Sequence, residues 1–294
     1  MDLSSTRDIK KRIANVSSVE QIIKAMDMVA STKLIRARES LDGIRPIYLN
    51  LKRIVTELGK QMENAEHKFF KERTDTKNTL YVVLTSDRGL SGSYNSNILS
   101  KALKHMNKGK NEKLIVVGTK GIDFFKREGK DIIRSVYDIS DDNVFYGTEN
   151  MAQNIHDVFL SDEVDIEEVY LVYTHFENVL TLEPKIEKLL PVEMDESDEN
   201  YITDIKFEPG TDNFIDHVVP LYLHMSLFRA FSEAHTSEQA ARMVSMDAAG
   251  KNANDLVEDL NRVYNRKRQA EITQELSEIV GSAESMKKGG TDDY

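Results

Sequence analysis

Polar and glycine residues gather at residues 86–92 (SDRGLSG), between a segment expected to be a strand and one expected to be a helix. In a doubly wound α/β fold, ligands bind at such strand-to-helix turns. The stretch lacks the G-x-G-x-x-G spacing of dinucleotide-binding proteins and the G-K-[ST] ending of a P-loop. A tight turn also calls for glycines at such a place. We therefore expect a structural turn here and no nucleotide site.

The other residues of metal-site or catalytic type have no spacing that supports such chemistry. The chain has seven histidines, at positions 67, 105, 156, 175, 217, 224 and 235. None forms an H-E-x-x-H motif, so surface or capping roles are expected. The acidic run of Asp195, Glu196, Asp198 and Glu199 does not fit an EF-hand and is interpreted as a solvated loop. There is no cysteine, which excludes disulfides and thiol chemistry. We expect no cofactor, no metal and no nucleophile–base pair.

A basic cluster near the end of the chain, formed by Arg262, Arg266, Lys267 and Arg268, is the remaining candidate. One interpretation is a solvated helix face with pairs such as Glu258–Arg262. The other is hydrogen bonding to a surrounding protein. The sequence alone leaves both open.

The element that must position this cluster is a very long helix, from about residue 212 to residue 286. No proline follows Pro220, and apolar residues recur at steps of three and four. A helix of roughly 65 residues would be about 100 Å long, far longer than a single domain is wide. Its apolar stripe then needs a partner. The alternative is two or three shorter helices, with a break at Gly250.

A second long helix is predicted from about residue 4 to residue 44, with Ser4 or Ser5 as its N-cap. Its apolar residues alternate in steps of three and four, as in a coiled-coil seam. Pro46 lies inside a pattern that continues to Leu58, where it predicts a kink or a short break. The simplest way to bury both stripes is an antiparallel coiled coil in which the longer C-terminal helix extends beyond its partner.

Between the two helices, short β-branched runs alternate with amphipathic helices. This pattern predicts a mainly parallel, Rossmann-like α/β sheet. Strands are expected at 80–85, 113–117, 132–138 and 168–174, with helices at 94–106, 119–128 and 149–159. Residues 177–182 and 185–192 are expected to add an antiparallel edge, and residues 201–207 a further short strand. The predicted domains are a helix at 1–60, an inserted α/β domain at 61–210 and a helix at 211–294.

The net charge and its distribution indicate which kinds of partner the chain could bind. The net charge of −11 argues against a general nucleic-acid binder. Residues 1–60 are basic within this acidic chain, which suggests an acidic or mixed-charge partner along the first helix or simply a solvated face. No apolar run reaches the length of a membrane span, and the N-terminus lacks the apolar core of a secretion signal.

Three motifs resemble the gamma subunit family of bacterial F-type ATP synthases, and the likeness extends end to end. They are residues 22–33 (IIKAMDMVASTK), residues 84–92 (LTSDRGLSG), and residues 237–246 (SEQAARMVSM) continuing to residues 264–280 (YNRKRQAEITQELSEIV). Ser91 stands where the family often has a cysteine.

The resemblance implies a central-stalk rotor, present in one copy, that couples transmembrane ion flow to ATP synthesis or hydrolysis. Its partners would be the alpha and beta subunits, the epsilon subunit and the c-ring. It would bind no nucleotide and catalyse nothing itself. It would lie at the cytoplasmic face of the bacterial membrane as a peripheral protein.

The resemblance also implies contact residues. Arg268, Gln269 and Thr273 would meet a beta-subunit loop, and Lys24 and Met26 the acidic lever segment of beta. The other contact residues implied are Arg242, Glu275, Phe207 and Glu208, the last two at the foot near epsilon and the c-ring. Two other classes remain as alternatives: a nucleotide-binding α/β enzyme with helical arms, and a coiled-coil structural adaptor or membrane-surface protein.

Overall fold

The computed structural model describes residues 5–61, 67–71, 78–106, 111–139, 143–161, 165–193 and 211–289. The chain divides into two compact units. Residues 1–28 and 246–294 form one, which we call the helical unit, and residues 29–245 form the other, the α/β unit. Two long helices, α1 (Thr6–Gln61) and α5 (Thr211–Gly289), contribute residues to both.

The α/β unit is built on a five-stranded sheet with strand order β3-β2-β1-β4-β5. The strands are β1 (Asn78–Leu84), β2 (Asn111–Val117), β3 (Asp131–Val136), β4 (Glu168–Phe176) and β5 (Leu182–Leu190). The first four are parallel, and β5 pairs antiparallel with β4 at the edge. The predicted α/β class and the antiparallel edge are therefore confirmed.

One predicted strand is wrong. Residues 177–182 form the turn between β4 and β5, apart from Leu182, which begins β5. The Asn178 side-chain oxygen accepts hydrogen bonds from the backbone N–H groups of Leu180 and Thr181, both at 2.9 Å. This Asx-type turn reverses the chain, so β4 extends to Phe176 and pairs with β5 from Val169 to Phe176.

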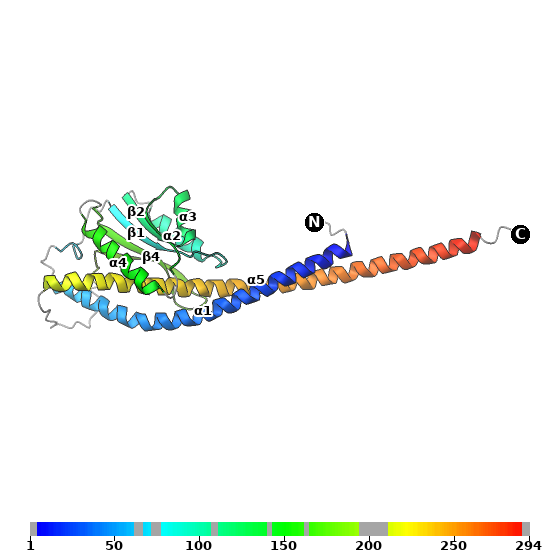
Figure 1. Ribbon diagram of the computed structural model, residues 1–294, viewed down its shortest axis with the longest axis horizontal. Coiled ribbons are helices and arrows are strands. Elements are labelled where there is room, and N and C mark those ends of the chain that lie inside the picture. Colours follow the sequence, from blue (N-terminus) through cyan, green and yellow to red (C-terminus); the bar gives the residue numbers. More distant parts are fainter. Residues whose placement is uncertain are drawn as a thin grey trace. The chain divides into compact units, whose positions relative to one another are not determined.

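Helices cover both faces of the sheet (Figure 1). On one face, α2 (Tyr94–Met106) and α3 (Thr119–Arg127) pack against Tyr81 and Val83 of β1. On the other face, α4 (Val144–Leu160) packs with parts of α1 and α5 against Leu80, Val82 and Leu84. The alternation along β1 follows from the two-residue repeat of a strand. The prediction for α2 matches its bounds, whereas α4 begins five residues earlier than predicted, at Val144 rather than Glu149.

The first long helix begins at the cap predicted from the sequence. Ser5 Oγ accepts a hydrogen bond from the backbone N–H of Asp8 at 3.2 Å and donates to the Asp8 carboxylate at 2.7 Å. The helix runs through Pro46 to Gln61 as one element, so Pro46 does not divide it. Of the two outcomes expected at Pro46, the short break does not occur, and the apolar pattern that continues to Leu58 belongs to the same helix.

The C-terminal helix α5 is one element of 79 residues and continues through Gly250, where a break was the alternative. A Cβ atom built on Gly250 would lie 3.7 Å from Ile23 Cγ2, an ordinary van der Waals contact. The glycine therefore lies on the face that packs against α1.

In both units the two long helices pair antiparallel. In the helical unit Gly250 lies beside Ile23, and the Asn254 amide, turned with its nitrogen toward Glu20, donates to Glu20 Oε1 at 2.6 Å. In the α/β unit Arg45 lies 3.5 Å from Glu233. The antiparallel coiled coil predicted from the periodicity is confirmed. Across the described residues, no helix has a stretch apolar and long enough to cross a bilayer.

Candidate functional site

The turn at residues 86–92 is filled by hydrogen bonds of the chain itself. Asp87 Oδ1 accepts from the backbone N–H and the hydroxyl of Thr119, at 2.9 and 2.8 Å, at the start of α3. Asp87 Oδ2 accepts from the backbone N–H of Asp138 at 3.2 Å. A helix N-terminus is where a phosphate would bind, and here a carboxylate of the chain takes that position.

The crevice at the carboxyl ends of β1 and β4, where the strand order reverses, is the usual ligand position in such sheets. Here α5 covers it. Ser237 Oγ donates to the backbone oxygen of Thr174 at 3.1 Å, and Tyr94 Oη donates to that of Ala234 at 3.1 Å. The geometry therefore gives the turn a packing role, in agreement with the sequence analysis.

Arg242, one of the contact residues implied by the resemblance, lies in this contact between α5 and the turn. Its guanidinium is buried and donates to Glu238 at 2.5 Å, to Gln239 at 3.2 Å and to the backbone oxygen of Gly89 at 3.4 Å. These bonds hold the turn against α5. A contact of Arg242 with another protein stays a prediction.

Arg268, Gln269, Thr273 and Glu275 are all exposed on α5 in the helical unit. With residue 20 opposite residue 254 and equal rise along both helices, Thr6 falls opposite about residue 268. The described helix continues from there to Gly289, past the start of α1. The structure thus places these predicted contact residues together on the part of α5 that extends beyond its partner.

Apolar side chains of the stripe predicted along the C-terminal helix lie on the same extension. Ile272, Leu276, Ile279 and Val280 are 47%, 58%, 64% and 58% exposed. Their spacing of three and four residues gives them one helix face. An exposed apolar stripe of this kind is typical of a surface that another protein covers.

Lys24 and Met26 lie on α1 in the helical unit. Lys24 is exposed and its ammonium lies 2.5 Å from Glu20 Oε1, while Met26 is half-buried. The neighbouring Val19 and Ile22 are more than half exposed. Phe207 and Glu208, the predicted foot contacts, lie outside the described residues, as does the strand predicted at 201–207.

Arg262 of the basic cluster is solvated and forms ion pairs within its own helix. Arg262 lies 3.6 Å from Glu258 and 3.1 Å from Asp259, with all three side chains about 70% exposed. Such exposed pairs contribute little to stability. The histidines form no metal-ligand group within the described part of the chain. The expected surface role is wrong for His224, which is buried and lies 3.0 Å from the backbone oxygen of Phe145.

A buried polar cluster, which the sequence analysis missed, joins four elements of the α/β unit. We call it the Arg229 cluster; its members are Arg45 and Tyr48 of α1, Tyr173 and His175 of β4, Glu187 of β5, and Arg229 and Glu233 of α5. The only sequence signal was the Arg229–Glu233 spacing of four residues, which predicts a same-helix ion pair and no more.

Arg229 is the centre of the cluster. It donates to Glu187 Oε2 at 2.6 Å, to Tyr173 Oη at 2.7 Å and to Glu233 Oε1 at 3.4 Å. Its guanidinium lies 4.2 Å from the ring centre of Tyr48 and 5.0 Å from that of Tyr173. Burial lowers the pKa of Arg229, but Glu187 more than offsets this and the pKa is raised. The side chain is therefore charged at every pH of interest.

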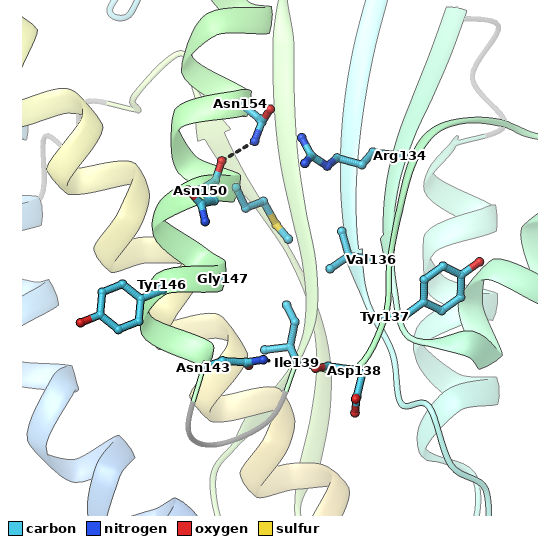
Figure 2. A pocket seen from close by; sticks show the side chains of 11 residues that line it. Arg134, Val136, Tyr137, Asp138, Ile139, Asn143, Tyr146, Gly147, Asn150 and Asn154 are labelled. Atoms are coloured by element: carbon cyan, nitrogen blue, oxygen red, sulfur yellow. Dashed lines mark hydrogen bonds between the residues drawn. The ribbon is translucent and has the colours of Figure 1, made fainter.

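A groove of about 350 Å³ lies between β3 and α4. Figure 2 shows the side chains that line it. Arg134 points into it from β3, facing Asn150 and Asn154 on α4, and the Asn154 amide donates to the backbone oxygen of Asn150. Val136 and Met151 line its apolar part. Tyr137, Asp138 and Tyr146 also belong to the lining.

The chain is similar to known proteins over most of its length. A family model described as ATP synthase matches residues 5–286. A relative named ATP synthase gamma chain from Desulforamulus reducens is 39% identical over 285 residues, covering 97% of this chain and 100% of its own. One from Alkaliphilus metalliredigens is 36% identical, covering 96% and 98%.

Solved structures agree. A chain of the central stalk/c-ring of Tetrahymena thermophila mitochondrial ATP synthase is 28% identical with a TM-score of 0.61, and the match covers 78% of this chain and 99% of that one. A chain in the Euglena gracilis mitochondrial ATP synthase, in the structure of OSCP, F1 and c-ring, has a TM-score of 0.69 at 20% identity, covering 98% and 97%. The second likeness is one of fold.

Proposed function

The chain belongs to the ATP synthase gamma chain family, and we propose that it works as the central-stalk rotor of a bacterial F-type ATP synthase. One copy would turn inside the ring of alpha and beta subunits. The epsilon subunit and the c-ring would bind at the other end of the stalk. The chain is then a component of an ion-transporting ATP synthase and carries no catalytic residue of its own.

The mechanism is conformational coupling. A rotor whose faces differ presents a different surface to each beta subunit in turn. Each surface stabilises a different conformation of the catalytic site, and so changes its affinity for ADP, phosphate and ATP. Ion flow drives the turning during synthesis, and ATP hydrolysis drives it in reverse. The chain needs no nucleotide site for this role.

The observation that carries the proposal is the extension of α5 past the start of α1. It presents Arg268, Gln269, Thr273 and Glu275, together with an apolar stripe, on a helix face without described neighbours from α1. We assign this extension to contacts with the beta subunits. The assignments of Lys24 and Met26 to the beta lever, of Arg242 to a partner, and of Phe207 and Glu208 to the foot belong to the same proposal.

The proposed division of labour follows the chain order. The helices at 1–60 and 211–294 form the shaft, and the domain at 61–210 binds the epsilon subunit and c-ring. This arrangement makes the chain a peripheral protein at the cytoplasmic face of the membrane. The alternative functions, a nucleotide-binding enzyme or an adaptor, have no comparable observation in their favour.

Reconstitution tests the proposal. The chain is mixed with the alpha and beta subunits of its own organism, and the products are separated by size-exclusion chromatography and assayed for ATP hydrolysis. We expect a complex with one copy of this chain and sustained ATP turnover. Well-folded subunits that form no complex with the chain would overturn the proposal.

A further inference from the structure

In the α/β unit, the faces of α5 that meet the sheet and α4 are mostly apolar. Val219, Leu223, Leu227 and Ala230 are fully buried there. Apolar contacts are non-directional, so they define the position and rotation of the helix less sharply than hydrogen bonds do. A rotor shaft must resist such turning, because any slip between the shaft and the domain that drives it loses torque.

Arg229 supplies directional contacts at the centre of this apolar face. From α5 it donates to Tyr173 on β4 and Glu187 on β5, and it stacks on the Tyr48 ring of α1. The guanidinium is a rigid planar fork, so these bonds fix its orientation as well as its position. Sliding α5 by one residue, about 1.5 Å, would break hydrogen bonds of 2.6 and 2.7 Å.

Glu233, one helical turn further along α5, also fixes the position of the helix. The Glu233 carboxylate bonds to His175 of β4 and lies 3.5 Å from Arg45 of α1. Tyr48 and Tyr173 in turn donate to the two oxygens of Glu187, at 2.8 and 2.9 Å. The bonding partners are therefore themselves held in place.

Stability alone does not require this cluster. Taking a guanidinium and two carboxylates out of water is costly, and replacing buried ion pairs by apolar residues of similar volume is often neutral or stabilising. Hydrogen bonds and ion pairs of this kind also require defined distances and angles, so they restrict the geometry of the elements that they join. The position of the cluster, where α1, α5, β4 and β5 meet, is where a single geometry would matter to a rotor.

We propose that Arg229 is a positioning residue, which together with Glu187 and Glu233 prevents α5 from turning or sliding on the sheet. Torque then passes between the shaft and the inserted domain without slip. This inference rests on the proposed rotor function. Arg229 touches no reacting group, and its effect on catalysis would pass through the stiffness of the rotor.

The test measures that stiffness in the assembled complex. The alpha–beta ring is fixed to a surface, and a bead is attached to the inserted domain through Glu149→Cys, an exposed position on α4 in a chain that has no other cysteine. During pauses at low ATP, the variance of the bead angle is inversely proportional to rotor stiffness. The main variant is Arg229→Met with Glu187→Gln, which removes the ion pair without leaving Glu187 charged and unpaired.

We expect the double variant to assemble, to hydrolyse ATP and to increase the angular variance roughly twofold, because the strongest directional bonds of α5 to the sheet are lost. Arg229→Lys, which keeps the charge but not the fork, should give a smaller increase. The control is Leu227→Ala, a buried neighbour on α5 whose loss destabilises the fold without removing a directional bond.

Two results would overturn the proposal: a double variant whose angular variance equals that of the unmodified rotor, or an equal increase in Leu227→Ala. If the double variant fails to assemble, the angular variance of Arg229→Lys decides: a variance equal to that of the unmodified rotor would overturn the proposal. A parent chain that forms no rotating complex would count against the rotor function itself, and so is distinguishable from failure of this inference.

Discussion

Asp87 Oδ1 accepts hydrogen bonds from both the backbone N–H and the hydroxyl of Thr119, at 2.9 and 2.8 Å. One carboxylate thus joins the turn after β1 to the first residue of α3. Because Asp87 Oδ2 also accepts from the backbone of Asp138, three chain segments meet at this side chain. The arrangement gives the SDRG sequence a structural role.

Replacing Asp87 should therefore destabilise the α/β unit. Asp87→Ala removes the acceptor at the start of α3, which should lower the free energy of unfolding by about 1–2 kcal/mol. Asp87→Asn, which keeps one oxygen, should lose less. Urea unfolding followed by circular dichroism measures both. An alanine variant as stable as the parent would contradict the role assigned to this carboxylate.

A side chain at Gly92 should destabilise the fold. Its φ is +56°, and a Cβ atom would lie 2.8 Å from Ser245 Oγ. Gly92→Ala should cost about 1–2 kcal/mol from the left-handed backbone and more from the clash. The matched control is Gly129→Ala, where φ is +66° and nothing lies within 4 Å of the added atom.

A second substitution separates the two contributions at Gly92. Adding Ser245→Ala to Gly92→Ala should restore only the part due to the clash, leaving a loss equal to that of Gly129→Ala. Equal losses for the two single glycine variants would mean that the contact with Ser245 does not matter.

The stability that Glu187 supplies should depend on pH. Burial alone would raise its pKa, but Arg229 and hydrogen bonds from Tyr48 and Tyr173 outweigh it, so the pKa lies below the ordinary 4.5. A lowered pKa in the folded state stabilises the fold above pH 4.5, and this contribution is lost as pH falls through the folded-state pKa.

The measurement compares the free energy of unfolding of the parent and of Glu187→Gln between about pH 6 and about pH 3. The difference should be constant at the upper end and shrink toward the lower end. Glu149→Gln, at an exposed position, serves as the control. A difference that does not vary with pH would show that Glu187 gains nothing from ionisation in the fold.

If the extension of α5 contacts a beta subunit, substitutions there should lower ATP turnover of the complex without changing the stability of the chain. Arg268→Ala with Gln269→Ala should lower ATP turnover of the assembled complex by about threefold to tenfold, if each side chain makes one hydrogen bond to a beta subunit. Because both are exposed, the stability of the isolated chain should change by less than about 0.5 kcal/mol.

Asn252→Ala, exposed on the same helix in the part that α1 covers, is the control for this pair. Unchanged turnover in the double variant would remove the assigned contact. Turnover that falls equally in Asn252→Ala would mean that the loss is not specific to the extension.

The coiled coil should not make the chain a dimer. The seam is closed within one chain, where Gly250 packs beside Ile23 and Asn254 pairs with Glu20. Sedimentation of the isolated chain should therefore give a monomer at micromolar concentration. A stable dimer would favour the adaptor function over the rotor.

The long helices and the sheet could be predicted because their signals are local and repeated. Apolar residues at steps of three and four mark α1 and α5, and β-branched runs mark the strands. The start of α4 was missed because Val144, Phe145 and Tyr146 favour strands and Gly147 interrupts the pattern. The contact that secures this start is distant in sequence: the Phe145 ring lies 4.6 Å from that of His224.

The Arg229 cluster could not be predicted from the sequence. Its bonds join residues 42 and 56 positions apart, from Arg229 to Glu187 and to Tyr173. Periodicity places each of these residues on an element but does not say which polar side chains will meet when the elements pack. The extension of α5 beyond α1 and the need of its apolar stripe for a partner were predicted. The kind of partner stayed open, since an apolar repeat looks the same whether its partner is the same chain or another protein.

The most direct test of the rotor function is to watch the chain turn. With the alpha–beta ring fixed to a surface and a bead on Glu149→Cys, addition of ATP should produce stepwise rotation in one direction that stops when ATP is removed. A complex that hydrolyses ATP while the bead only fluctuates about a fixed angle would contradict the account.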